Sequence, residues 1–168
     1  MTAPRQEGNG RRPGIASIAL LAGLFLQAGL PSAIQATTTE RVVVNRFSGL
    51  AIEGFDPVAY FTDGKALLGD EQFEASQAGA VWRFRNEGNR ASFVAHPDIY
   101  GPQFGGYDPV DLARGVTVAG NPRFWLVSKQ RLYLFSREPN RNAFVADPVR
   151  VLRNAVSRWP GIEQTLAE

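Results

Sequence analysis

The pentapeptide Gly54-Phe55-Asp56-Pro57-Val58 decides the fold, because the chain repeats it as Gly106-Tyr107-Asp108-Pro109-Val110. A second stretch, NRASFVAHP at 89–97, recurs as NRNAFVADP at 140–148. With one single-residue gap near Asp63, 15 of the 46 pairs aligned between 54–100 and 106–151 are identical. Unrelated segments match much less often, so we interpret 54–105 and 106–168 as two diverged copies of one unit.

Both units predict the same order of elements. The Gly-x-Asp-Pro-Val start predicts either a turn into a strand or a first helical turn, capped by the aspartate and with proline at its first position. In the first unit, residues 58–61 favour a strand that enters an Asp-Gly turn. A strand pair follows in each unit, within 73–84 and within 124–135, and residues 128–130 predict a hairpin turn.

Helices are expected after each strand pair. Residues 88–95 and 139–146 predict short helices, each stopped by the following proline. Asp147-Pro148 then predicts the start of a last helix, whose apolar stripe would consist of Val149, Leu152, Val156 and Trp159. We therefore expect an α+β fold in which two small antiparallel strand pairs pack on short helices, closed by a C-terminal amphipathic helix. Neither unit is large enough to bury a core comfortably alone, so the two should share one.

Residues 1–36 predict an export segment. Arg11-Arg12 precede the sixteen-residue apolar stretch 15–30, which is shorter than the about 20 residues of a spanning helix and suits a signal peptide. Cleavage after Ala36 is expected, with an uncleaved anchor in the inner membrane as the alternative. Residues 37–53 would form a linker and a leading strand. The mature protein is therefore expected outside the cytoplasm, periplasmic or secreted.

Charge and cysteine content exclude several classes of protein. The net charge of +2 belongs to the leader, since residues 37–168 carry 15 basic and 15 acidic side chains. Without a basic excess, nucleic-acid binding is not predicted, and membrane contact is expected only through an uncleaved leader. Residues 37–105 are net acidic and 106–168 net basic. This difference indicates either electrostatic attraction between the units or drift in composition between the two halves without a function. The absence of cysteine excludes disulfides, thiolate ligands and lipoprotein acylation.

The first unit resembles a known family. The segments GFDPVAYF at 54–61, WRF at 82–84, NR at 89–90 with Phe93, and YGPQFGGY at 100–107 resemble the exported bacterial proteins with a YHS domain. The resemblance covers about residues 50–110 and extends more loosely to Trp159. It implies the fold of a YHS module rather than an activity. Exported members commonly carry a cysteine where this chain has Asp108, so the resemblance implies at most a degenerate metal-handling module, without a metal or cofactor.

Seven residues are candidates for ligand binding: Asp56, Tyr60, Trp82, Tyr107, Asp108, Arg90 and Arg141. Asp56 and Asp108 are equivalent in the repeat and could form a paired-carboxylate site, although a turn or helix cap is the commoner use of Asp-Pro. The two arginines at helix starts could bind an anion, or they could belong to solvated helix faces. The aromatic residues belong either to the core or to the wall of a pocket between the units.

The remaining motifs argue against catalysis. His96 is the only histidine, and its counterpart in the second unit is Asp147, so a polar residue at a helix end explains both positions. Gly105-Gly106 is interpreted as an ordinary tight turn. We assign no catalytic and no metal-binding residue, and expect a non-catalytic domain that binds a small molecule or a protein partner. A carboxylate-dependent enzyme with a cleft between the units is the alternative.

Overall fold

The computed structural model describes residues 41–166, and the export segment predicted at 1–36 lies outside these residues. The first half contains η1 (Ile52–Gly54), α1 (Ala59–Thr62), β1 (Asp70–Gln77), β2 (Ala80–Phe84), α2 (Glu87–Ala95), α3 (Pro97–Tyr100) and η2 (Gln103–Gly106). The second half contains α4 (Pro109–Leu112), β3 (Asn121–Ser128), β4 (Arg131–Phe135), α5 (Glu138–Ala146) and α6 (Pro148–Glu163).

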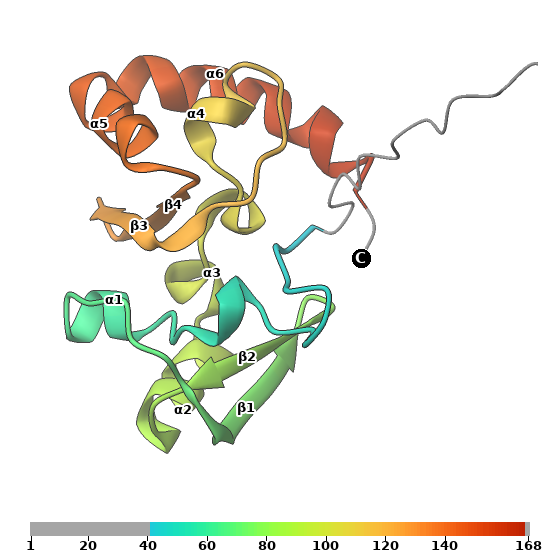
Figure 1. The fold of residues 1–168 in the computed structure, drawn as a ribbon, viewed down its shortest axis with the longest axis vertical. Helices are drawn as coiled ribbons and strands as arrows, with labels where there is room; N and C mark the ends of the chain where they lie inside the picture. Colours follow the sequence, from blue (N-terminus) through green and yellow to red (C-terminus); the bar gives the residue numbers. More distant parts are fainter. Residues whose placement is uncertain (1–40, 167–168) are drawn as a thin grey trace, which may run out of the picture. The chain divides into compact units, whose positions relative to one another are not determined.

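The predicted α+β class is confirmed, with two small antiparallel sheets and a C-terminal helix (Figure 1). A short helix, a hairpin and two further helices follow one another in the same order in both halves. The duplication itself stays an interpretation of the sequence. Among residues 41–166, no helix is long and apolar enough to cross a membrane.

Both hairpins turn tightly. Gln77 pairs with Ala80 and Ser128 with Arg131, which leaves two turn residues in each hairpin. All four turn residues have positive φ, as two-residue turns of this kind require. The register shifts early in both hairpins, between Asp70 and Glu74 in β1 and at the corresponding place in β3.

The strand predicted at 58–61 is wrong, because these residues enter α1 instead. Asp56 Oδ1 accepts hydrogen bonds from the backbone amides of Val58 and Ala59, and this satisfies donors that a helix start leaves open. Asp108 caps α4 in the same way, with Pro109 at the first helical position. Of the two alternatives for Gly-x-Asp-Pro-Val, the capped helical turn is therefore correct. The leading strand expected within 37–53 is represented, in its described part, by isolated bridges only.

Strand β4 contributes buried side chains to two parts of the core. Leu132 and Leu134 are fully buried in the cluster of the first half, against Trp82, Phe84 and Phe93. The intervening side chains of β4, Tyr133 and Phe135, lie in a cluster of the second half with Phe144. Because successive side chains of a strand point to opposite faces, β4 joins the two halves into one core.

The buried stripe of α6 differs from the predicted one. Val151 and Ala155 are buried, whereas Val149 and Val156 are 64% and 59% exposed. The helix begins at Pro148 and packs on α4, which turns the face of Val151 inward and leaves the first and third predicted positions in solvent. Only the partly buried Leu152 and Trp159 of the predicted stripe contact the core.

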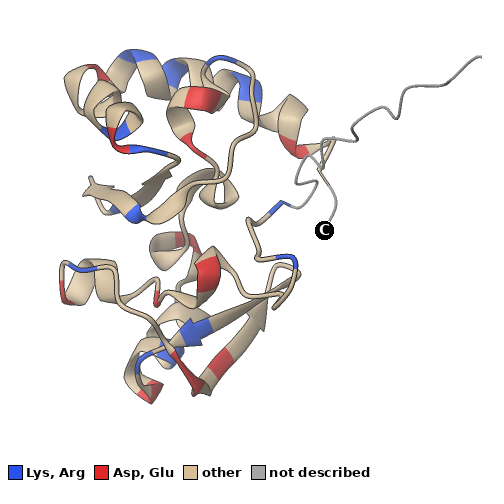
Figure 2. Cartoon of the chain, in the orientation of Figure 1, with Lys and Arg blue, Asp and Glu red and all other residues tan. Residues whose placement is uncertain are grey.

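Charged side chains are distributed over both halves, and basic ones recur along α6 (Figure 2). Every ion pair among residues 42–166 joins two residues of the same half, such as Arg83 with Glu74 at 2.7 Å. A cross-half bond runs from Arg131 Nη1 to the carbonyl oxygen of Asp98 at 2.7 Å. The contacts between the halves described so far are therefore apolar packing and hydrogen bonds.

Candidate functional site

Asp56 is fully buried and holds its own half together. Besides capping α1, it accepts hydrogen bonds through Oδ2 from the backbone amide of Arg85 at 2.8 Å and from Asn89 Nδ2 at 2.6 Å. These donors come from the end of β2 and from α2. A carboxylate with this many internal donors is a structural anchor, because its hydrogen bonds offset the cost of burying its charge.

Asp108 is the corresponding anchor of the second half and is equally buried. Its Oδ2 accepts hydrogen bonds from the backbone amide of Ser136 at 2.7 Å and from Asn140 Nδ2 at 2.6 Å. A second buried carboxylate, Asp111, accepts hydrogen bonds from the Ser136 hydroxyl at 3.1 Å and from Asn140 Nδ2 at 2.9 Å, and Arg137 contacts it at 3.4 Å. Sequence analysis missed Asn89 and Asn140 as carboxylate partners, although their recurrence at the same place in both halves is the signal that would have revealed them.

The two predicted carboxylates have separate sets of hydrogen-bond donors. Each receives its hydrogen bonds from its own half, and neither lines either of the two hollows described below.

Tyr60 joins the two halves of the chain. It lines neither of the two hollows beside the tip of the β1–β2 hairpin. Its hydroxyl donates to the carbonyl oxygen of Pro122 at 3.0 Å, and its ring meets Trp125 edge-on at 5.1 Å. Burial, and then the charge of Asp56, raise the pKa of Tyr60 above its ordinary value of 10.0. The phenol is thus held neutral, as a hydrogen-bond donor to the Pro122 carbonyl.

The other two predicted aromatic residues are also buried. Tyr107 lies beneath α6, where its ring centroid is 6.2 Å from that of Trp159. The Trp82 ring lies tilted against Phe93 with 4.8 Å between the ring centroids, and its indole nitrogen donates to the carbonyl oxygen of Gln77 at 3.0 Å. Trp82 is the only one of the seven predicted residues that lines one of the hollows described below.

The two predicted arginines form local ion pairs on helix surfaces. Arg90 contacts Glu87 at 2.7 Å and Arg141 contacts Glu138 at 3.6 Å, each three residues back along its helix. The hydrogen bond from Arg90 lowers the pKa of Glu87. Pairs of this kind are typical of solvated helix faces, which is the alternative to anion binding.

His96 is exposed at the junction of α2 and α3 and makes no capping bond with its side chain. Its counterpart Asp147 caps α6 by accepting a bond from the backbone amide of Arg150 at 3.1 Å, and this bond is the main reason why the pKa of Asp147 is lowered. Within residues 41–166, no group of three or more histidine and carboxylate side chains lies close enough to hold a metal ion.

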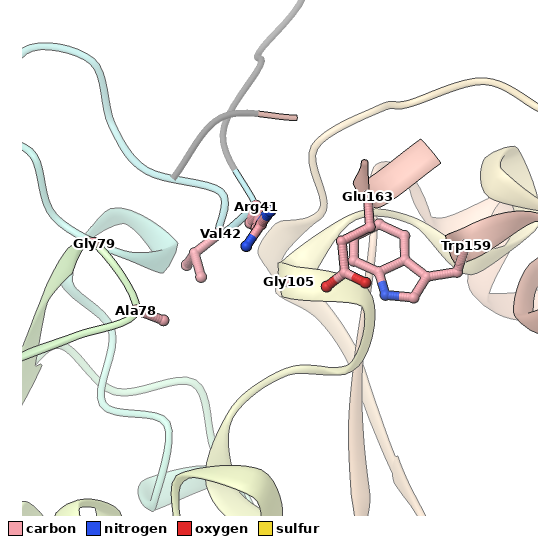
Figure 3. A pocket seen from close by; sticks show the side chains of 7 residues that line it. All are labelled: Arg41, Val42, Ala78, Gly79, Gly105, Trp159 and Glu163. Carbon is pink, nitrogen blue, oxygen red and sulfur yellow. The ribbon is translucent and has the colours of Figure 1, made fainter. Parts of the chain in front are cut away.

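An open hollow of about 500 Å³ lies between the tip of the β1–β2 hairpin and α6. Its volume is typical of small-molecule sites. Arg41 and Val42 enter from the N-terminal segment, while Trp159 and Glu163 project from α6 (Figure 3). Its remaining lining residues are Ala78, Gly79 and Gly105.

A smaller, mainly apolar recess of about 160 Å³ adjoins the hollow and shares Val42, Ala78 and Gly105 with it. The other residues that line the recess are Gln77, Trp82, Phe93, Pro97, Gly101 and Pro102. The two hollows together form what we call the α6 pocket, with a polar mouth and an apolar recess.

Gly105 lets the N-terminal segment approach η2 closely on one wall of the α6 pocket. Its carbonyl oxygen accepts a hydrogen bond from the backbone amide of Val43 at 2.8 Å, which brings the N-terminal segment onto η2. A side chain at this position would collide with the carbonyl oxygen of Arg41, and φ is +62°. The predicted tight turn is therefore also a place of close backbone approach. On the opposite wall, Phe104 holds the Trp159 ring edge-on at 5.7 Å.

Comparison of the chain with protein-family models, with curated proteins and with solved structures finds no match.

Proposed function

We propose that this chain is an exported, non-catalytic domain related to YHS modules, and that it binds a small organic molecule in the α6 pocket. The observation that carries the proposal is the pocket itself: a hollow of about 500 Å³, with Trp159, Arg41 and Glu163 on its walls, that adjoins an apolar recess. Binding sites combine apolar walls with a few polar groups in this way.

The hydrogen bonds of the predicted acid–base groups favour binding over catalysis. Asp56 and Asp108 accept bonds from backbone amides and from Asn89 and Asn140, and these bonds occupy both oxygens of each carboxylate. The Tyr60 hydroxyl is bonded to the Pro122 carbonyl. An enzyme built on these groups would first have to break the bonds that hold each half together.

Export and the family relation rest on the sequence. A basic start, a short apolar stretch at 15–30 and a small-residue end at Ala36 occur in the order of a signal peptide. Asp108 stands where exported YHS proteins commonly have a cysteine, and here it caps α4. We therefore propose binding of an organic ligand rather than of a metal.

A thermal-shift screen of small organic molecules on the purified protein tests the binding function. We expect hits whose stabilisation is lost in Trp159→Ala and retained in Val156→Ala, which changes an exposed residue of the same helix. Hits that are indifferent to Trp159, or a broad screen without hits, would contradict the proposal. A fusion of residues 1–40 to a reporter that is active only outside the cytoplasm tests export, and a silent reporter would contradict it.

A further inference from the structure

The α6 wall of the pocket has the composition of a cation site. Trp159 and Glu163 are one helical turn apart, so their side chains project on the same side of α6. Figure 3 shows the indole ring and the carboxylate on this wall of the hollow. A carboxylate beside an aromatic ring attracts an ammonium group through charge and through the ring face.

The opposite wall carries the opposite charge. Arg41 lines the hollow from the N-terminal segment, and Figure 3 shows its guanidinium group across the hollow from Trp159. A guanidinium group presents parallel N–H donors that match a carboxylate. A ligand that spans the mouth therefore meets a guanidinium group on one side and a carboxylate beside an aromatic ring on the other.

The recess adds a third requirement for the ligand, which is an apolar group. Its side-chain walls include Trp82, Phe93, Pro97 and Pro102. A cavity of about 150 Å³ with apolar walls admits a benzene ring, so the recess of about 160 Å³ suits a branched aliphatic or aromatic group. A charged group would lose part of its hydration there against walls that are mainly apolar.

On the basis of the proposed function, we infer that the α6 pocket takes a zwitterion with one apolar arm, namely a free apolar amino acid or the end of a short apolar peptide. The ammonium group lies against Trp159 and Glu163, the carboxylate lies against Arg41, and the side chain enters the recess.

Calorimetric titration of the purified full chain tests each part of this assignment. Leucine and phenylalanine are compared with glycine, which lacks the arm, with N-acetyl-leucine, which lacks the ammonium group, and with leucinamide, which lacks the carboxylate. We expect saturable one-to-one binding of leucine or phenylalanine, and at least tenfold weaker binding of the other three.

Two variants then assign the charges to their walls. Glu163→Gln should weaken leucine binding at least tenfold and leave the residual binding of N-acetyl-leucine unchanged. Arg41→Gln should weaken leucine binding and leave leucinamide unchanged. Arg46→Gln and Glu71→Gln, which alter exposed residues outside the pocket, serve as matched controls and should bind leucine like the parent.

The outcomes separate this inference from the proposed function. If the zwitterions do not bind while another molecule binds in a Trp159-dependent way, the ligand class is wrong and the binding function stands. If leucine binds but neither Glu163→Gln nor Trp159→Ala weakens it, the α6 pocket is not the site and both are overturned. Equal binding of leucine and leucinamide would refute the role given to Arg41.

Discussion

The side-chain amide of Asn140 donates a 2.6 Å hydrogen bond to the buried carboxylate of Asp108, 32 residues earlier in the chain. Asn89 makes the same bond to Asp56, also at 2.6 Å. In each half, one carboxylate thus ties the start of the unit to the helix that follows its hairpin. The recurring aspartate and asparagine of each half are therefore anchors of the fold.

Removal of an anchor should destabilise the protein strongly. Asp56→Ala leaves the amides of Val58 and Arg85 and the side chain of Asn89 without their acceptor, and we expect a loss of about 3 kcal/mol or more in the free energy of unfolding. Asp98→Ala, at an exposed aspartate, should change it by no more than about 0.5 kcal/mol. Urea unfolding measures both, and equal effects would refute the anchor role.

Gly105→Ala should disturb the pocket by a steric clash and not by backbone strain alone. Gly105 and Gly64 share a φ of +62°, but a methyl group at Gly64 has no atom within 4 Å whereas one at Gly105 meets the Arg41 carbonyl. Gly64→Ala should cost about 1–2 kcal/mol, the strain of a left-handed alanine. Gly105→Ala should cost clearly more and speed hydrogen exchange at the Val43 amide, measured by mass spectrometry. Equal losses of stability in Gly64→Ala and Gly105→Ala would contradict the close approach of Gly105 to the Arg41 carbonyl.

Tyr60 should make the protein sensitive to high pH. Because burial raises its pKa in the folded state, Tyr60 stabilises the fold below its ordinary pKa of 10.0, and the unfolded chain gains by ionising it above that pH. The free energy of unfolding should fall by about 1.4 kcal/mol per pH unit above pH 10 for this group. Tyr133, whose pKa burial also raises, adds to the fall.

The Tyr60→Phe variant isolates this contribution. At pH 7 it should be less stable by about 1–2 kcal/mol, because the buried carbonyl of Pro122 loses its donor. Between pH 10 and 11 its stability should fall less steeply than that of the parent. Urea unfolding over this pH range provides both values, and parallel curves would show that Tyr60 is not the group responsible.

The corrected buried face of α6 can be checked with two valines. Val151→Ala removes methyl groups from a side chain that is 3% exposed, and should lower the free energy of unfolding by about 1–2 kcal/mol. Val149→Ala alters a side chain that is 64% exposed and should change it by no more than about 0.5 kcal/mol. A larger loss in the free energy of unfolding for Val149→Ala than for Val151→Ala would show that the apolar stripe predicted from the sequence is the buried one.

The two halves should not fold separately. Leu134 of β4 is fully buried in the cluster of the first half, Tyr60 binds the Pro122 carbonyl, and Arg123 lies 5.2 Å above the ring of Phe55. Residues 37–105 and 106–168, expressed apart, would each expose this surface and should show no cooperative melting. Two sharp transitions in the separated halves would refute a shared core.

The sequence predicted best what local chemistry determines. The two strand pairs, the helices at 88–95 and 139–146 and the start of α6 at Pro148 were predicted, because turn residues, prolines and apolar runs carry strong local signals. The strand predicted at 58–61 was wrong. Its β-branched and aromatic residues favour a strand, whereas the Asp56 cap and the packing of Tyr60 favour a helix.

The pocket was largely invisible in the sequence. Arg41, Ala78, Gly105 and Trp159 are distant in the chain and meet only through the packing of α6 and η2. Among the predicted candidates, Asp56 and Asp108 recur at the same place in both halves, and both accept hydrogen bonds that hold their half together. Residues that line a single hollow between the β1–β2 hairpin and α6 have no reason to recur.

Strand β4 contributes side chains to the cores of both halves, and this affects whether β2 could replace it, within one chain or in a neighbouring molecule. In the sequence alignment, Arg83 of β2 corresponds to Leu134 of β4, and Leu134 is fully buried. If β2 took the place of β4, within one chain or in a neighbouring one, the guanidinium group of Arg83 would enter the apolar cluster without Glu74, its partner at 2.7 Å. A chain with two similar hairpins is exposed to such mispairing during folding, and this single leucine-to-arginine difference makes the wrong pairing costly.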